Sequence, residues 1–307
     1  MPHCTTTATG GATKPPYAEV TSILCQTSSS LPTTILLSSP PIDLVILPPT
    51  TSAATVTIRL PQSTALHSRF VRGLIPRQRR LFNMAWACSG SSNSELINNM
   101  AAAGLISSDR VKHAMLEVDR AHYAPARVYE DSPQPIGHSA TISAPHMHAS
   151  ACESLLPFLK PGSRVLDIGS GSGYLTHVLA SLVTPGGSVV GIDHIQSLVD
   201  MAARNTAKSD AGRRMLDDGT ITYVKGDGRK GWPQGAPYDA IHVGAAAAEH
   251  HEALVDQLKT PGRLFVPVEE GYVQHIYVVD KKQDGSVERK KLYAVQYVPL
   301  TDAPSGH

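Results

Sequence analysis

Residues 140–149, ATISAPHMHA, bring a serine and two histidines close together, with a further histidine and a cysteine nearby. Such residues can form a metal site, a serine nucleophile with its base, or a loop beside a ligand pocket. The candidate metal donors are His138, His146, His148 and Cys152. Their spacing lacks the close pairs of zinc sites, and Ser143 lacks the strand-turn-helix setting of a nucleophilic serine. The pattern therefore favours histidines with a structural role beside a ligand loop, and no metal.

A glycine-rich turn further along, VLDIGSGSGYLT, predicts a ligand-binding site. Gly169, Gly171 and Gly173 stand between a strand-like run and a helical pattern, so the main chain there can approach a ligand closely. A dinucleotide fingerprint would need glycine at position 174, where the chain has Tyr174. Asp167 precedes the turn; it would repel a pyrophosphate but suits a ligand with a positively charged amine.

Two more carboxylates follow predicted strands. Asp193 ends VVGID, where an acid can accept hydrogen bonds from the hydroxyls of a ribose. Asp227, in GDG, ends the next strand and can accept from the exocyclic amine of an adenine. An amino-acid end, a ribose and an adenine without phosphate describe S-adenosylmethionine. The residues therefore predict this cofactor.

The second half of the chain supplies the elements that would position these residues. Apolar runs predict strands at 163–169, 187–193, 221–227, 238–245 and 262–268, and helical patterns fall at 174–183, 195–209 and 249–258. The segment 274–300 is typical of a hairpin that turns at Asp284-Gly285. Alternating strands and helices predict an α/β fold with a doubly wound, mostly parallel sheet and an antiparallel C-terminal hairpin. Such sheets bind ligands at the carboxyl ends of their strands, beside the switch in strand order.

Two short helices are predicted before this region. Ser92 and Glu95 have capping-box spacing ahead of a helical apolar pattern, and Gly104 ends that helix. A second helix begins after Ser108, with apolar residues along one side.

Composition excludes several classes of function. The chain has 307 residues, of which 41% are hydrophobic and 17% charged, with a net charge of +1. This balance is ordinary for a globular protein and gives no electrostatic case for nucleic acid or an anionic membrane. The four cysteines are far apart, which favours a reduced intracellular protein, and no apolar run is long enough to span a membrane. No pattern indicates an oligomer, so a monomer is expected.

The first 83 residues differ from the rest. Residues 1–80 contain seven Lys or Arg side chains against two acids, together with 23 Ser or Thr. We expect 1–83 to be a disordered extension, and 84–307 to be the folded domain. A basic, Ser-rich segment is also typical of an organelle transit peptide, whereas Met84 could serve as an alternative start. The predicted location is the cytoplasm or nucleus, or a plastid or mitochondrion if the extension is a transit peptide.

Several blocks together resemble the protein-L-isoaspartate O-methyltransferase family. They are MAWACSGSSNSELI, EDSPQPIGHSATISAPHMHA, LDIGSGSGYLT, GIDHIQSLVD, GDGRKGW, PYDAIHVGAAA, PGRLFVPV and YVPLTD. The likeness spans about residues 84–302, and the extension is similar to those of some plant members. It implies a Rossmann-like S-adenosylmethionine-dependent methyltransferase fold and an enzyme that acts on isoaspartyl-containing peptides and proteins.

The resemblance also implies roles for individual residues. Ser143 falls on the family's active-site serine. Ile136, Gly137, His138 and Ser139 correspond to a strip that closes over cofactor and substrate. His138 departs from the family pattern, which usually has an aromatic residue there. The implied cofactor or pocket positions are His148, Gly169, Asp193, Asp227, Gly228 and Thr301.

The implied reaction is methylation of the free carboxylate of L-isoaspartyl, and also D-aspartyl, residues. That carboxylate is already ionised near pH 7, so the reaction needs no strong base. Catalysis then depends mostly on positioning, and we expect Ser143 to bind and orient the carboxylate. The ester then cyclises to a succinimide without the enzyme, which begins repair. Rival interpretations are a small-molecule methyltransferase and a catalytically silent cofactor-binding module. A nicotinamide dehydrogenase is disfavoured by Asp167 and Tyr174.

Overall fold

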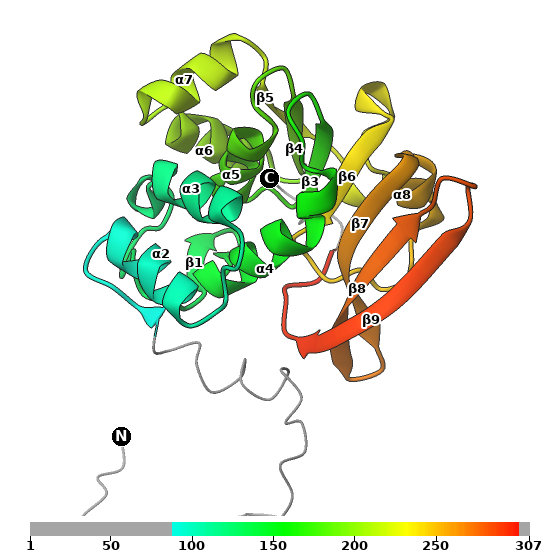
Figure 1. Ribbon diagram of the computed structural model, residues 1–307, viewed down its shortest axis with the longest axis horizontal. Helices are drawn as coiled ribbons and strands as arrows, with labels where there is room; N and C mark the ends of the chain where they lie inside the picture. The colour runs from blue at the N-terminus through cyan, green and yellow to red at the C-terminus, as the bar shows by residue number, and fades with distance from the viewer. Residues whose placement is uncertain (1–87, 301–307) are drawn as a thin grey trace, which may run out of the picture. The chain divides into compact units, whose positions relative to one another are not determined.

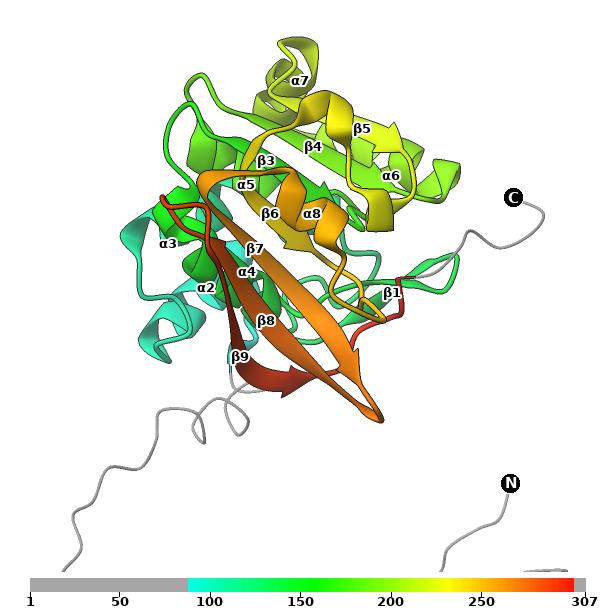
Figure 2. The same cartoon turned by 90° about the vertical axis from the view of Figure 1, so that its right-hand side faces the viewer.

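The computed structural model describes residues 88–300 of the chain. The predicted extension 1–83, the alternative start Met84 and the predicted pocket residue Thr301 lie outside the described residues. A seven-stranded sheet forms the centre, in the order β5-β4-β3-β6-β7-β8-β9 (Figures 1 and 2). Its first five strands are parallel, while β8 and β9 are antiparallel to their neighbours.

The strands of this sheet are β3 (Arg164–Ile168), β4 (Ser188–Asp193), β5 (Ile221–Lys225), β6 (Tyr238–Val243), β7 (Leu258–Glu270), β8 (Val273–Lys281) and β9 (Val287–Val295). A separate hairpin pairs β1 (Gln134–Gly137) with β2 (Ala140–Ile142). The helices are α2 (Asn93–Ala102), α3 (Asp109–Glu117), α4 (Pro145–Leu155), α5 (Tyr174–Val183), α6 (Gln196–Thr206), α7 (Asp210–Asp217) and α8 (Glu252–Asp256).

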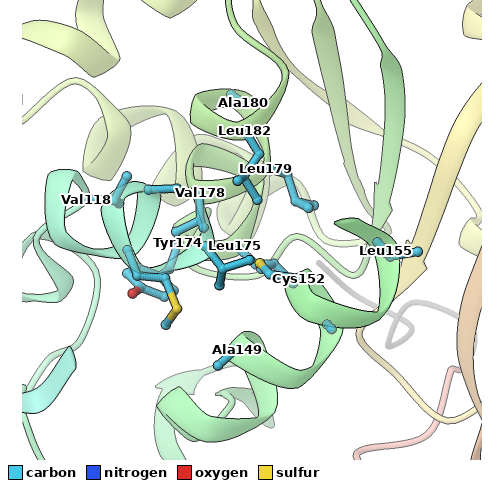
Figure 3. Packing of buried hydrophobic residues seen from close by; sticks show 14 of the residues in the cluster. Val118, Ala149, Cys152, Leu155, Tyr174, Leu175, Val178, Leu179, Ala180 and Leu182 are labelled. Atoms are coloured by element: carbon cyan, nitrogen blue, oxygen red, sulfur yellow. The ribbon is translucent and has the colours of Figure 1, made fainter. Parts of the chain in front are cut away.

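Hydrophobic clusters cover both faces of the sheet, because successive strand residues point to opposite sides. In β3, Val165 faces a cluster formed with α2, α3, α4 and α5, whereas Leu166 faces a cluster formed with α8. Helix α5 is buried over almost its whole surface, and Leu175 and Leu179 lie in the same packed group as Cys152 of α4 (Figure 3). The start of α5 is therefore held firmly against the sheet.

The two N-terminal helices begin as predicted. The Ser92 side chain accepts a hydrogen bond from the Glu95 N–H, and the Ser108 side chain accepts one from the Arg110 N–H. The Glu95 carboxylate, however, accepts from Ser91 and not from Ser92, so only half of a capping box forms. Each cap satisfies an N–H group that has no partner within its helix.

The predicted α/β architecture is confirmed, with its parallel sheet and its C-terminal hairpin across Asp284-Gly285. The helix expected at 249–258 is shorter and spans only Glu252–Asp256, because Leu258 already pairs with Tyr238 as the first residue of β7. Sequence reasoning did not predict the β1–β2 hairpin, α4 or α7. Helix α4 has a recognisable signal, a proline at its first position.

Candidate functional site

A pocket of about 200 Å³, here named the large pocket, lies at the carboxyl ends of β3, β4 and β6. Strand β3 stands between β4 and β6 in the sheet, so this is the predicted switch in strand order. The β1–β2 turn and residues 298–300 complete the wall. The predicted cofactor residues that line it are His138, Ser139, Gly169, Gly171, Asp193 and Gly228.

A second pocket of about 30 Å³, the small pocket, adjoins the large one. Ser143, His148 and Asp167 line it. The two pockets share the lining residues Thr141, Gly169, Gly171 and Gly244. Two ligands bound in these pockets would therefore meet beside the glycine turn.

The three glycines of the turn have different roles. Gly169 and Gly171 have φ values of +75° and +51° and line both pockets, where an added Cβ atom at Gly171 would lie 3.3 Å from Ile136. Gly173 lines neither pocket. It caps α5 with φ +86°, and a Cβ atom there would lie only 2.6 Å from the hydroxyl of Tyr223. Gly169 and Gly171 can therefore approach a ligand, whereas Gly173 is required by packing.

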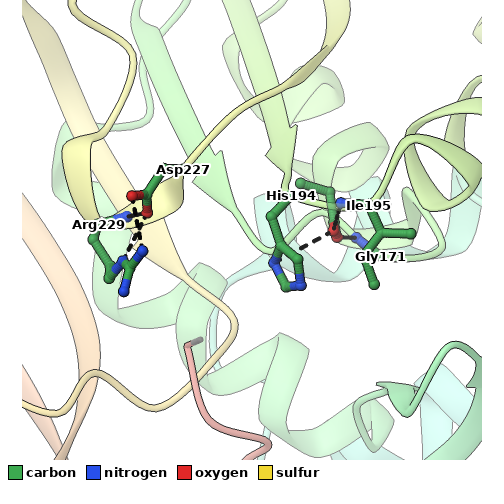
Figure 4. A network of polar contacts seen from close by, with 6 residues as sticks. Gly171, His194, Ile195, Asp227 and Arg229 are labelled. Carbon is green, nitrogen blue, oxygen red and sulfur yellow. Dashed lines mark hydrogen bonds and ion pairs between the residues drawn. The ribbon is translucent and has the colours of Figure 1, made fainter. Parts of the chain in front are cut away.

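Asp193 ends β4 at the wall of the large pocket and is 6% exposed. Its carboxylate accepts hydrogen bonds from the N–H groups of Gly171 and Ile195, both at 3.1 Å (Figure 4). Burial raises the pKa of Asp193 above its usual range, although these two main-chain bonds oppose the shift. A buried carboxylate beside a pocket gains from any further hydrogen-bond donor, and ribose hydroxyls would supply such donors.

Asp167 lies at the wall of the small pocket, but both of its oxygens are already engaged. Oδ1 is 2.7 Å from Nδ1 of His242 across the β3–β6 register, and Oδ2 accepts from the Thr176 hydroxyl at 2.5 Å. A carboxylate oxygen has more than one acceptor direction, so a ligand amine can still bind there.

Asp227 lies at the start of a short 3-10 turn and lines neither pocket. Its two oxygens accept from Arg229 Nε and Nη2 at 2.9 and 3.0 Å (Figure 4). The Arg229 hydrogen bond is the main cause of a lowered Asp227 pKa. Neighbouring Gly228 does line the large pocket, where a Cβ atom would lie 2.4 Å from Ile168. Adenine recognition by the Asp227 carboxylate stays a prediction, and in the structure that carboxylate is paired with Arg229.

Ser143 lies two residues before α4 and is held through its main chain, since its carbonyl accepts a hydrogen bond from Arg120 Nη2 at 2.9 Å. His148, one turn further along α4, packs its ring 5.1 Å from that of Tyr174. Burial holds the His148 pKa well below its usual value, so the ring is neutral at pH 7. The small pocket thus presents a serine and a neutral histidine.

The β1–β2 turn closes one side of the large pocket. Ile136 is buried, while Gly137, His138 and Ser139 have φ values of +93°, +51° and +56°. His138 and Ser139 occupy the two central positions of a two-residue hairpin loop, where Asn and Gly are usual. His138 Nε2 lies 2.9 Å from the Ser197 hydroxyl at the start of α6. The turn is therefore fastened across the pocket.

Several lining residues were not predicted from the sequence, among them Thr141, His242 and Gly244. Gly244 directly follows β6, so the rule that ligands bind at strand ends could have identified it. His242 lies inside an apolar strand, and only the strand pairing shows that it faces Asp167.

The side chains that the sequence analysis weighed as metal donors and disfavoured have other partners or are buried. His146 bonds to Asp131 at 2.8 Å, and Cys152 is fully buried. Among residues 88–300 no group of three or more His, Cys, Asp or Glu side chains could hold a metal ion. None of the helices within that range has the length and apolar character needed to cross a bilayer.

Comparison with known proteins agrees with this geometry. A sequence model of the family "Protein-L-isoaspartate(D-aspartate) O-methyltransferase" matches residues 91–305. A protein-L-isoaspartate O-methyltransferase of Caenorhabditis elegans is 46% identical over 218 residues, which cover 71% of this chain and 96% of that protein. Protein-L-isoaspartate O-methyltransferase 2 of Arabidopsis thaliana is 48% identical over 225 residues, covering 72% of each chain.

Solved structures include a Plasmodium falciparum protein described as a candidate protein-L-isoaspartate O-methyltransferase in complex with S-adenosyl-L-homocysteine. It is 35% identical with a TM-score of 0.65, and the match covers 69% of this chain and 99% of that one. The family match over most of the chain and the relatives at nearly half identity lead to one conclusion. This chain belongs to the protein-L-isoaspartate(D-aspartate) O-methyltransferase family.

Proposed function

We propose that this protein transfers a methyl group from S-adenosylmethionine to the free carboxylate of L-isoaspartyl, and also D-aspartyl, residues in damaged peptides and proteins. The observation that carries the proposal is the pair of adjoining pockets, one lined by Asp193 and the glycine turn and the other by Ser143. The relatives that share this chain's family bear the name of this activity.

The large pocket fits the cofactor. Gly169 and Gly171 line it with main chain that carries no side chain, and Asp193 offers buried carboxylate oxygens to a ribose. Asp167, which lines the small pocket beside the shared glycine turn, suits the amine of the cofactor. S-adenosylmethionine supplies the methyl group, and these residues bind and orient it.

The small pocket fits an acceptor that needs no base. Its histidine, His148, is neutral, and an isoaspartyl carboxylate is ionised at pH 7. One carboxylate oxygen forms the bond to the methyl carbon, no proton moves, and the product is a neutral ester. Ser143 and nearby main-chain N–H groups hold the carboxylate in line, which is the positioning that this reaction requires.

The test uses the full chain, S-adenosylmethionine with a labelled methyl group, and two peptides that differ only in Asp against isoAsp. We expect base-labile label in the isoAsp peptide alone. Label in neither peptide, with cofactor still bound, would favour a small-molecule methyltransferase or a catalytically silent binding module. Label in both peptides would contradict the proposed selectivity.

We further propose that the enzyme acts as a monomer on isoaspartyl-containing proteins, in the cytoplasm or nucleus unless residues 1–83 direct it to an organelle. Gel filtration with light scattering would test the first point. Microscopy of fluorescent fusions of the full chain and of the chain from Met84 would test the second.

A further inference from the structure

Arg120 is a buried cation that forms no ion pair with a carboxylate among the described residues. It begins a short 3-10 helix (Arg120–His122), is 0% exposed, and within residues 88–300 no carboxylate lies in ion-pair range of it. One nitrogen, Nη2, donates to the Ser143 carbonyl at 2.9 Å, while Nε and Nη1 have no hydrogen-bond partner in the described part of the chain. Burying a charge that is not fully paired costs folding free energy, so the buried position of Arg120 needs an explanation.

The surroundings of Arg120 lead to the small pocket. Its guanidinium lies 5.4 Å from the ring centroid of Tyr174, and the same ring packs against His148, which lines the pocket. The positive charge of Arg120 also contributes, after burial, to the low His148 pKa. The field of Arg120 therefore reaches a residue at the pocket wall.

No lysine or arginine lines the small pocket. Its only acidic lining residue is Asp167, whose oxygens are bonded to His242 and Thr176 and which the proposed function assigns to the cofactor amine. Asp131 is the acid whose charge acts on Arg120, but it lies outside ion-pair range: its Oδ1 is bonded to His146, and its Oδ2 is buried without a hydrogen-bond partner among the described residues. A carboxylate in the small pocket would thus be attracted by the positive charge of Arg120, which is bonded to the Ser143 carbonyl.

We propose that Arg120 is the positioning residue and counter-charge for the acceptor carboxylate, which makes the small pocket select a carboxylate over its neutral ester or amide. The inference rests on the proposed function and adds a means of product release. Once the carboxylate has become a methyl ester, it no longer carries the charge that Arg120 attracts. The ester therefore leaves the site more readily than the substrate.

The expected size follows from Coulomb's law. Two unit charges about 8 Å apart at an effective dielectric constant of about 20 change a binding constant by roughly 30-fold. We therefore expect the wild-type protein, saturated with S-adenosylhomocysteine, to bind an isoaspartyl peptide roughly 10- to 100-fold more tightly than its isoasparaginyl analogue, which carries a neutral amide.

Calorimetric titration of both peptides is then repeated with two variants. Arg120→Gln keeps a hydrogen-bond donor but removes the charge, and we expect its preference to fall below about threefold while the affinity for S-adenosylhomocysteine stays within about twofold. Arg120→Lys keeps the charge and should restore most of the preference. The matched control is Arg110→Gln, because Arg110 also donates to main-chain carbonyls, those of Leu159 and Leu182, but is not part of either pocket. It should leave the preference unchanged.

Unchanged selectivity in Arg120→Gln would overturn the inference, as would equal loss of both peptides and of S-adenosylhomocysteine in both Arg120 variants. If neither variant folds, the wild-type titration decides, since equal affinity for the two peptides shows that no counter-charge acts. A wild-type protein that neither binds nor methylates the isoaspartyl peptide would instead contradict the proposed function.

Discussion

Replacement of Gly173 by alanine should destabilise the fold without a direct effect on either pocket. The residue has φ +86°, which costs a non-glycine residue about 1–2 kcal/mol. The added Cβ atom would also lie 2.6 Å from the Tyr223 hydroxyl and 3.0 Å from the Ala202 Cβ atom, and such overpacking costs about 1–3 kcal/mol. The sum is about 2–5 kcal/mol, or roughly 5–15 °C in Tm for a domain of this size.

Two further variants separate these contributions. At Gly104, φ is +75° but nothing lies within 4 Å of an added Cβ atom, so Gly104→Ala should show the backbone cost alone. Tyr223→Phe removes the hydroxyl that bonds to Thr206 and to the Gly173 carbonyl, at a cost of about 1–3 kcal/mol.

The Gly173→Ala/Tyr223→Phe double variant should be about 1–2 kcal/mol more stable than the sum of the single changes, because the clash with the hydroxyl is gone. Urea unfolding of the four proteins gives this coupling energy. Additivity within about 0.5 kcal/mol would refute the packing explanation. If Gly173→Ala binds the cofactor more weakly at temperatures where the variant is folded, Gly173 contributes to cofactor binding as well as to packing.

Three other changes test the site. Ser143→Ala should lower kcat by roughly 10- to 100-fold and leave the Kd of S-adenosylmethionine nearly unchanged, and equal loss of both would indicate a collapsed loop. Acidification should protonate the Asp193 carboxyl and lower the cofactor affinity, and because the pKa of Asp193 is raised this loss should begin at a higher pH than for an ordinary aspartate. In calorimetric titrations, Asp193→Asn should remove this pH dependence. Ser197→Ala removes the hydroxyl that lies 2.9 Å from His138 Nε2 and should raise the cofactor dissociation rate about two- to tenfold in stopped-flow measurements. An unchanged rate would show that this bond does not fasten the turn.

Much of the architecture follows from local patterns. Buried apolar runs such as VLDI and AIHV indicate strands, and their alternation with helical patterns indicates a parallel sheet. Ser92 and Ser108 mark helix starts because capping depends on neighbouring residues alone. Asp193 was predictable for the same reason, since the carboxyl end of a strand can be recognised locally and Asp193 lines the large pocket.

What could not be predicted depends on residues far apart in the chain. The pattern GxGxG cannot distinguish Gly171, which borders the pockets, from Gly173, which is confined by Tyr223 from another strand. Nothing in the segment DRAHY shows that Arg120 is buried against Tyr174 and Ser143. The His138-Ser139 turn was missed because neither residue favours positive φ, and the hairpin supplies what local preference lacks.

Strand β9 affects how this protein interacts with its protein substrates. It forms one edge of the sheet, and it carries the run Glu288, Arg289, Lys290 and Lys291, with Arg289 paired to Glu252. Charged side chains, lysine above all, discourage another chain from adding a strand to an exposed edge. Damaged proteins that are partly unfolded expose apolar segments able to form strands. An enzyme that binds such proteins can therefore co-aggregate with its own substrates. The charged side chains of β9 therefore oppose the pairing of this sheet edge with an exposed strand of a substrate protein.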